Sequence, residues 1–401
     1  MQIKQYQTTK YIMGNGALRE VQRWKDKKIG LVVDENVLKA LQLETKLFDE
    51  LLKDCDYEVL CNMPQEPTTE LLEPAIRKAQ RFDPDVFVAI GGGSVLDSAK
   101  VLWLFTEFPD YTWEQAFAPY AVESFTKEKE LIAIPTTSGT GSETTGCAVV
   151  KDTEKRKCMV LSNEIMPSTA ILDYELLVSL PKHVIAFSGC DALAHALEAG
   201  ISVLASDMVR MQSVQAAVQI IKQLEASCNG DLNARRDIHL SATIAGACIN
   251  NSITGMAHGM DQAGGDFRKP HGLMTGLILP YTMCHLLPQP LYEEVADQLG
   301  ICGTSMEKQE RLIARIWEMY RKIEMPVTLQ EAGIDRKAYM CKIDTYVKQA
   351  MQDANVQCAP KTFSAAELKA MYQELYDGKE WRTAYELSLI HISEPTRLQL
   401  I

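Results

Sequence analysis

The chain lacks the features that mark secreted, membrane-spanning and nucleic-acid-binding proteins. Its 11 cysteines have no paired spacing and their number is odd, so neither a disulfide framework nor a zinc ribbon is indicated. The 41 basic residues are outnumbered by 53 acidic ones, and the formal charge of -12 argues against a nucleic-acid surface. The first residues form no apolar signal core, and no apolar run is expected to approach the about 20 residues of a membrane helix. We therefore expect a cytoplasmic protein with reduced thiols that binds neither nucleic acid nor membrane.

The end of the chain resembles the product of a sequencing adapter. Residues Leu387 to Arg397 match the in-frame translation of a transposase adapter used in sequencing libraries. Scars of this kind are excluded from reasoning about the fold. We therefore expect residues 387–401 to be an artefact tail, and His391 is not a candidate ligand.

Strand and helix signals divide the remaining chain into two parts. Before residue 181, short runs rich in β-branched residues alternate with helical patterns, as in a parallel sheet with crossover helices. Expected strands cover 28–33, 57–60, 85–90 and 131–134, and expected helices cover 37–52 and 70–82. From residue 181 onward, helical patterns rich in alanine and methionine dominate, at 184–204, 206–224, 234–249, 272–285, 308–322 and 336–352. The sequence thus predicts an α/β domain over 1–180 and an all-α domain over 181–386.

A glycine-rich turn follows the third expected strand. Gly91, Gly92 and Gly93 end this strand and open a helix, where free backbone N–H groups can bind a pyrophosphate. The motif is not the Gly-x-Gly-x-x-Gly fingerprint of dinucleotide folds. An alternative interpretation is a tight turn in which Ser94 and Asp97 form a capping box. Phosphate binding and a capped turn both stay open at this point.

An acidic residue ends the first expected strand. Dinucleotide folds use an aspartate at this place to accept hydrogen bonds from the adenosine ribose hydroxyls, and Asp34 stands there. A carboxylate would repel a 2′-phosphate, so NAD is expected over NADP. An aspartate after a strand is also a common turn former, and that alternative stays open.

The second part of the chain carries a set of residues suited to a metal ion. Asp191 and His195 are four residues apart in a helical pattern, so both side chains leave one face. His258 follows an alanine-rich helix, and His271 stands between a proline and a glycine. One carboxylate and three imidazoles would hold Fe(II) or Zn(II) and leave coordination positions open for substrate. The alternative for each histidine is a hydrogen-bonded core or surface residue.

Taken together, these motifs resemble the iron-containing alcohol dehydrogenase family over roughly residues 5 to 380. The resemblance rests on Gly189–Glu198, His258–Met260, Pro270–Gly272, Gly91–Lys100 and Pro135–Glu143. It implies that the first domain binds a dinucleotide and the second a metal ion. It also implies a cofactor site formed by Gly91, Gly92, Gly93, Ser94, Asp97, Thr136, Thr137, Thr140 and Lys157, to which the strand position adds Asp34. Lys157 lies in an exposed basic cluster, which is equally typical of a solvated turn.

The resemblance also implies an activity. A member of this family would use NAD(H) and iron to interconvert a primary alcohol, or a hydroxy acid, and its aldehyde. Asp191, His195, His258 and His271 would be the catalytic metal ligands, and a homo-oligomer acting on small molecules is expected. Two other classes stay open: a dehydroquinate-synthase-like lyase that uses NAD and a metal, and a non-catalytic nucleotide or metal sensor. Net NADH formation with simple alcohols distinguishes the three.

Two positions near the ligands need a separate interpretation. Many relatives carry a further histidine where this chain has Gln262, and an amide does not titrate near neutral pH. The proton path is therefore not expected to run through this position. Glu198, three residues after His195, is expected either to hydrogen-bond a metal ligand or to lie at the surface.

Overall fold

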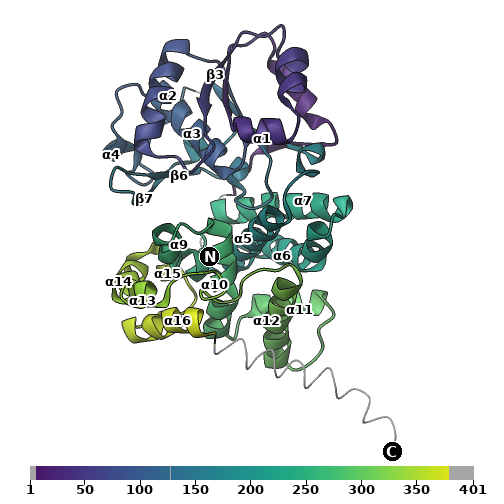
Figure 1. Ribbon diagram of the computed structural model, residues 1–401, viewed down its shortest axis with the longest axis vertical. Helices are drawn as coiled ribbons and strands as arrows, with labels where there is room; N and C mark the ends of the chain where they lie inside the picture. The colour runs from purple at the N-terminus through teal and green to yellow at the C-terminus, as the bar shows by residue number, and fades with distance from the viewer. Residues whose placement is uncertain (1–5, 127, 379–401) are drawn as a thin grey trace, which may run out of the picture. The chain divides into compact units, whose positions relative to one another are not determined.

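The computed structural model describes residues 6–126 and 128–378, which form two compact units (Figure 1). One unit contains the described residues up to Leu180, and the other contains those from Pro181. The tail expected to derive from an adapter lies outside the described residues. An α/β part with a parallel sheet precedes a helical part, so the predicted fold class is confirmed.

The first unit is built on a six-stranded parallel sheet in the order β1-β8-β5-β4-β2-β3. Its strands are β1 (Lys10–Gly14), β2 (Ile29–Val33), β3 (Tyr57–Asn62), β4 (Val86–Gly91), β5 (Glu130–Pro135) and β8 (Thr169–Asp173). Parallel strands need crossover connections: α2 (Thr69–Phe82) leads from β3 to β4, and α3 (Gly93–Glu107) leads from β4 towards its neighbour β5. Every residue of β2 and β4 is buried, as expected where both faces of a parallel sheet are covered.

Alternate residues of each strand pack into different cores. On one face, Phe87 and Ala89 belong to the apolar cluster formed with α2 and α3. On the other face, Val88 and Ile90 pack with α1 (Glu35–Ala40) and the short helices η1 (Ala17–Trp24) and η2 (Thr45–Leu51). Figure 1 shows α2 and α3 on the side of the strands opposite to α1. The period-2 pattern of the strands therefore defines both cores.

The structure differs from the sequence prediction at several elements of this unit. The single helix expected over 37–52 is broken, because Gln42 adopts a left-handed backbone with φ 54° between α1 and η2. Strands β1 and β8 were not predicted, since each contains only three consecutive apolar residues, too few to distinguish a strand from a helix. The antiparallel hairpin of β6 (Cys147–Lys151) and β7 (Lys157–Leu161) was also missed. The unit further contains α4 (Trp113–Ala116).

The second unit consists of helices joined by turns and loops, and its described residues, 181–378, contain no strand. Its longer helices are α5 (Lys182–Ile201), α6 (Asp207–Cys228), α7 (Leu232–Asn250), α10 (His271–Leu286), α11 (Pro290–Gln298), α12 (Ser305–Lys322), α14 (Ile343–Gln352) and α16 (Ala365–Asp377). Shorter helices are α8 (Met256–Gly259), α9 (Gln262–Asp266), α13 (Arg336–Met340) and α15 (Ala354–Gln357). The helix expected over 336–352 is thus divided into α13 and α14.

Helix α5 is the centre of this unit. It packs against α6, α7 and α10, and its length and mean hydropathy of 1.3 would suffice to cross a membrane. The expectation that no apolar run would approach that length is therefore wrong for α5. However, 78% of the apolar stretch is buried inside the protein, so its hydropathy is that of a core helix. The proposed ligands Asp191 and His195 lie on this helix.

Candidate metal centre and nucleotide loops

Four side chains of the helical unit converge on one point. Asp191 and His195 stand one turn apart on α5, His258 lies on α8, and His271 is the first residue of α10. The Nε2 atoms of His195, His258 and His271 lie 4.0, 3.5 and 3.8 Å from Asp191 Oδ1. Ligand atoms about 2 Å from a shared ion lie roughly 3 to 4 Å apart, so this spacing fits one divalent cation. The structure therefore brings the four predicted ligands together.

The three ligands from α5 and α8 form the tightest part of this group. The ligand atoms of Asp191, His195 and His258 all lie within 4.8 Å of one another. His271 completes the set from α10, and its side chain is 36% exposed. A Cβ at Gly272 would lie 2.4 Å from the carbonyl oxygen of Phe187, so glycine is needed for α10 to begin this close to α5.

Two imidazoles are oriented by carboxylates outside the ligand set. His258 Nδ1 lies 2.6 Å from Glu198 Oε2, and His271 Nδ1 lies 2.7 Å from Asp261 Oδ2. A proton on Nδ1 donated to a carboxylate leaves the Nε2 lone pair directed at the metal position. Among the described residues, the buried Nε2 of His258 has no hydrogen-bond partner. An ion at the centre would satisfy this atom, so the residues present fit a metal.

Glu198 is a structural part of this centre. It is 3% exposed, and besides His258 its carboxylate accepts hydrogen bonds from the backbone N–H groups of Gly255 and Ala257. It thus joins α5 to the segment that presents His258. The expectation that Glu198 hydrogen-bonds a ligand is confirmed, and the surface alternative is wrong. The Thr275 hydroxyl, which sequence reasoning missed, donates to Asp191 Oδ1 at 2.7 Å.

The electrostatics of the centre favour a cation. Burial alone would raise the pKa of Asp191, but the three imidazoles hold it well below its usual range. Burial lowers the pKa of His195 to about 4, which keeps this imidazole neutral and able to donate its lone pair. Burial also opposes protonation of His258, but Glu198 and Asp191 together raise its pKa to about 10. The buried carboxylates thus require positive charge, and a metal ion can replace the proton on His258.

In the first unit, three predicted segments meet at one edge of the sheet. Strands β2, β4 and β5 are neighbours, so their carboxyl ends bring together Asp34, the glycines 91–93 and the loop 136–140. The backbone N–H of Thr136 donates to the carbonyl of Gly91 at 3.0 Å. This edge is where parallel α/β sheets bind nucleotides. Lys157 is not on these strands; it begins β7, opposite Lys151, and is exposed.

The two loops are in direct contact. A Cβ at Gly92 would lie 3.5 Å from the Thr137 hydroxyl, and one at Gly93 would lie 2.9 Å from the side chain of Thr140. In the part of the chain that the structure describes, the buried hydroxyl of Thr136 has no hydrogen-bond partner. A ligand with polar atoms would supply one. The glycines and the threonine hydroxyls therefore fit a bound nucleotide.

The start of α3 is not the capping box that the sequence suggested. Gly92 is the N-cap, and none of the described side chains caps this helix. Asp97 instead accepts hydrogen bonds from the Ser142 hydroxyl and the backbone N–H of Val149, at 2.6 and 3.0 Å. Ser94 lies in the first turn, where its carbonyl accepts from Ser98. Uncapped N–H groups next to glycine are suited to a phosphate.

Asp34 has a local structural role. It is the N-cap of α1, and its Oδ1 accepts hydrogen bonds from the backbone N–H groups of Asn36 and Val37, at 2.9 and 3.4 Å. The turn-forming alternative for Asp34 is therefore correct. Capping uses one carboxylate oxygen, so this role is compatible with a ribose contact through the other.

Gln262 lies at the start of α9, between the two ligands His258 and His271. Its amide donates to the carbonyl of Gly259 at 2.6 Å, and its Oε1 accepts from the Tyr372 hydroxyl at 2.5 Å. Both the amide nitrogen and the amide oxygen of Gln262 thus have hydrogen-bond partners within the protein. The second partner, Tyr372, is 110 residues away in the sequence. No local sequence signal indicates this contact.

Comparison with known proteins identifies the family. The family model described as iron-containing alcohol dehydrogenase matches residues 8–174 of the sequence. The family model for the C-terminal part of Fe-containing alcohol dehydrogenases matches residues 185–376. The chain belongs to the iron-containing alcohol dehydrogenase family. It is an alcohol oxidoreductase, so the lyase and sensor alternatives are set aside.

The relatives of this family member cover nearly all of it. The chain is 31% identical over 374 residues to the NADPH-dependent butanol dehydrogenase of Clostridium saccharobutylicum, spanning 92% of this chain and 96% of that one. It is 31% identical over 383 residues to the bifunctional aldehyde-alcohol dehydrogenase of Escherichia coli K12, which covers 86% of this chain but only 41% of that protein. The solved iron-containing alcohol dehydrogenase of Thermococcus thioreducens is 28% identical, with a TM-score of 0.85 over 94% of this chain and 100% of that one.

Two substitutions at the metal centre are expected to weaken metal binding to different extents. His258→Ala removes a ligand and should lose bound Fe(II) or Zn(II), while Glu198→Gln should weaken metal binding by about 10- to 100-fold because it only disorients His258. Metal content and competition with a chelator measure both effects. Glu310→Gln, an exposed change on α12, is the control and should bind metal like the wild type. Full occupancy in His258→Ala would show that this histidine is not a ligand.

Gln262 predicts a cost in stability with little cost in chemistry. Gln262→Ala loses two hydrogen bonds and should lower the free energy of unfolding by about 1 to 3 kcal/mol. Its kcat/KM should fall by much less than the roughly 10²- to 10⁴-fold expected for loss of a general acid or base. Tyr372→Phe breaks the same long-range bond and is the matched variant. A larger fall in kcat/KM, with metal and NADH bound normally, would mean that Gln262 positions substrate or water.

Proposed function

We propose that this family member is an iron-dependent, NAD(H)-linked dehydrogenase in which Asp191, His195, His258 and His271 hold the ion. The observation that carries the proposal is the approach of three imidazole Nε2 atoms to within 4.0 Å of one buried carboxylate oxygen. Zn(II) is the alternative ion, since imidazole and carboxylate suit both metals. The substrate is a small primary alcohol, or a hydroxy acid, which is interconverted with its aldehyde.

The side chains of the centre set its charge and orientation. When bound, a divalent ion supplies Lewis-acid stabilisation of negative charge on oxygen. Asp191 is the one carboxylate among the four ligands, so a divalent ion and its four ligands together carry a net positive charge. Glu198 and Asp261 fix the rings of His258 and His271 and hold their Nδ1 protons. These outer carboxylates make the ligand geometry independent of exposed side chains.

The nucleotide proposal rests on the edge of the sheet. Uncapped N–H groups at the start of α3 suit a pyrophosphate, and the Thr136–Thr140 loop offers hydroxyls beside them. Asp34 supports NAD over NADP, because its carboxylate would repel a 2′-phosphate. The Clostridium saccharobutylicum relative is named as NADPH-dependent, so the coenzyme differs among relatives. The proposed preference of this chain for NAD over NADP therefore rests on the negative charge of Asp34.

The remaining expectations concern the setting of the enzyme. All cysteines that the structure describes are free, which supports a reducing, cytoplasmic compartment. Met208 and Met211 on α6 are 53% and 70% exposed, which supports an oligomer contact. The excess of acidic residues supports the absence of a nucleic-acid partner.

The activity is tested with the metal varied independently of the substrate. The chain, reconstituted with Fe(II) or with Zn(II), is assayed with NADH against a panel of aldehydes that includes short aliphatic and carboxylate-bearing members. We expect NADH oxidation that depends on metal and on aldehyde, with the alcohol as product. Equal rates in the metal-free protein would contradict the proposed centre.

Asp34 predicts the coenzyme preference. Asp34→Ser keeps an N-cap for α1, because a serine hydroxyl caps about as well as a carboxylate, but it removes the charge. The ratio of kcat/KM for NADPH to that for NADH should therefore rise, with the melting temperature nearly unchanged. Asp152→Ser, which alters a carboxylate in the turn between β6 and β7, is the control. An unchanged ratio would mean that Asp34 does not face the coenzyme.

A further inference from the structure

We propose that the buried ion pair of Asp97 and Lys100 is a positioning element of the nucleotide site: it fixes the segment after β5 on α3 and so holds the two nucleotide loops together. The inference rests on the proposed nucleotide site. It assigns Asp97 a role through Ser142 instead of the direct cofactor contact that the family resemblance implied.

Lys100 is the centre of this element. Its side chain is 0% exposed, on the third turn of α3. The Nζ donates to Ser142 Oγ at 2.7 Å, to Thr145 Oγ1 at 3.1 Å and to the carbonyl of Cys147 at 2.7 Å. The ammonium therefore joins α3 to two points of the chain between β5 and β6 and to the first residue of β6.

Asp97 completes the pair one turn earlier on α3. Its Oδ1 lies 3.7 Å from Lys100 Nζ and accepts a hydrogen bond from the Ser142 hydroxyl at 2.6 Å. Its Oδ2 accepts from the backbone N–H of Val149 at 3.0 Å. Both oxygens thus have protein donors. The hydroxyl of Ser142 donates to one charge and accepts from the other.

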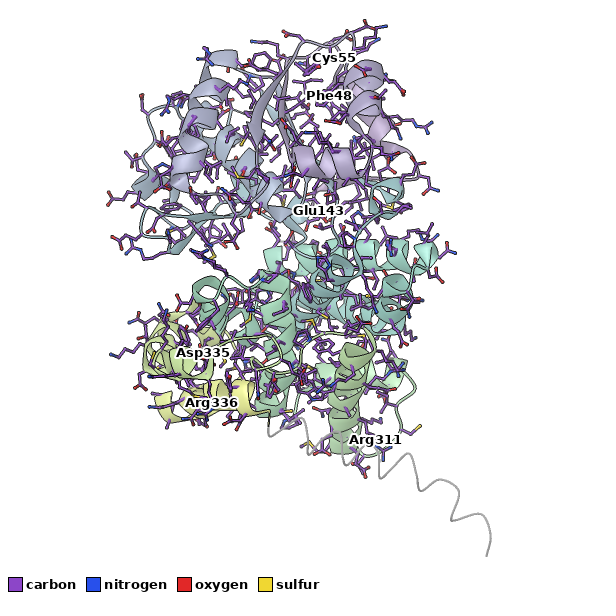
Figure 2. All side chains as sticks on the ribbon, in the orientation of Figure 1. Phe48, Cys55, Glu143, Arg311, Asp335 and Arg336 are labelled. Atoms are coloured by element: carbon purple, nitrogen blue, oxygen red, sulfur yellow. The ribbon has the colours of Figure 1, made fainter. Side chains whose placement is uncertain are left out.

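A short series of contacts leads from the ion pair to the glycine loop. The backbone N–H of Ser142 donates to Thr140 Oγ1 at 3.3 Å. The side chain of Thr140 is the group that a Cβ at Gly93 would meet at 2.9 Å. Ser142 begins the short helix η3 (Ser142–Thr144), and Figure 2 labels its next residue, Glu143, which is 3% exposed. The position of Thr140 beside the start of α3 therefore depends on Ser142.

The physical cost of the pair supports a role in geometry. Taking an ammonium and a carboxylate out of water costs about as much as their attraction returns, so a buried pair adds little net stability over apolar side chains. The ammonium of Lys100 nevertheless has three acceptors, and both oxygens of Asp97 have donors, so neither charge lacks hydrogen bonds. A charged network of this kind fixes two loops more sharply than apolar packing can.

The experiment compares NADH affinity with stability in the full-length, metal-loaded protein. Lys100→Met, Asp97→Asn and Ser142→Ala each remove one member of the network. The control is Lys129→Met, which breaks a 2.7 Å pair with Asp83 before β5, at the opposite edge of the same sheet. The dissociation constant for NADH comes from fluorescence titration, and the melting temperature and the kcat at saturating NADH are measured on the same samples.

We expect the dissociation constant for NADH to rise about tenfold or more in the three network variants, because loops displaced by a fraction of an ångström bind less well. The kcat at saturating NADH should change less than the dissociation constant. Lys129→Met should bind NADH like the wild type. Should Lys100→Met fail to fold, Ser142→Ala decides, since it removes a single hydroxyl. Wild-type affinity in the folded network variants, or an equal loss in Lys129→Met, overturns the inference.

One more variant separates this inference from the proposed function. Gly92→Asp places a carboxylate at the N-cap of α3, where it caps the helix and repels a pyrophosphate. We expect it to lose NADH binding without a lower melting temperature. If Gly92→Asp loses NADH while the network variants keep it, the inference falls and the nucleotide site stands. If Gly92→Asp binds NADH like the wild type, the loops are not the nucleotide site and both fall.

Discussion

Burial of a carboxylate is the constraint on which the helical unit depends. Asp191 is 2% exposed in the middle of α5, where an isolated charge would be strongly unfavourable. Three imidazoles and the hydroxyl of Thr275 surround it, and two more buried carboxylates, Glu198 and Asp261, each face an imidazole Nδ1. Three carboxylates against three imidazoles make positive charge a requirement of the fold as well as of the chemistry. Stability and metal binding are therefore linked in this unit.

The predictable part of the site follows from short spacings. Asp191 and His195 share a helix face because they are one turn apart, and Glu198 follows on the next turn. The glycine turn and Asp34 were found because each ends a strand, and the parallel sheet then brings such ends to one edge. Resemblance to the family supplied what spacing could not, namely that His258 and His271 join the pair on α5.

The unpredicted part depends on contacts between distant segments. Asp261 orients His271 and Thr275 donates to Asp191, but neither residue carries a pattern that distinguishes it from other polar side chains. Ser94 and Asp97 have the spacing of a capping box. Only the structure shows that Asp97 instead accepts a hydrogen bond from the distant Ser142 hydroxyl. The end of α1 before Gln42 likewise could not be predicted from the helical pattern, because it depends on the left-handed backbone of that single residue.

The contact between Gln262 and Tyr372 has a consequence for how this chain can change over evolution. An amide at position 262 and a phenol at position 372 form one hydrogen-bonded unit that links the segment between two metal ligands to the last described helix, α16. Substitution of either residue alone leaves its partner's polar group unsatisfied, so their effects are not additive. The two positions are thus expected to covary among sequences that keep this packing. Whether glutamine is favourable at position 262 therefore depends on the tyrosine 110 residues away in the sequence.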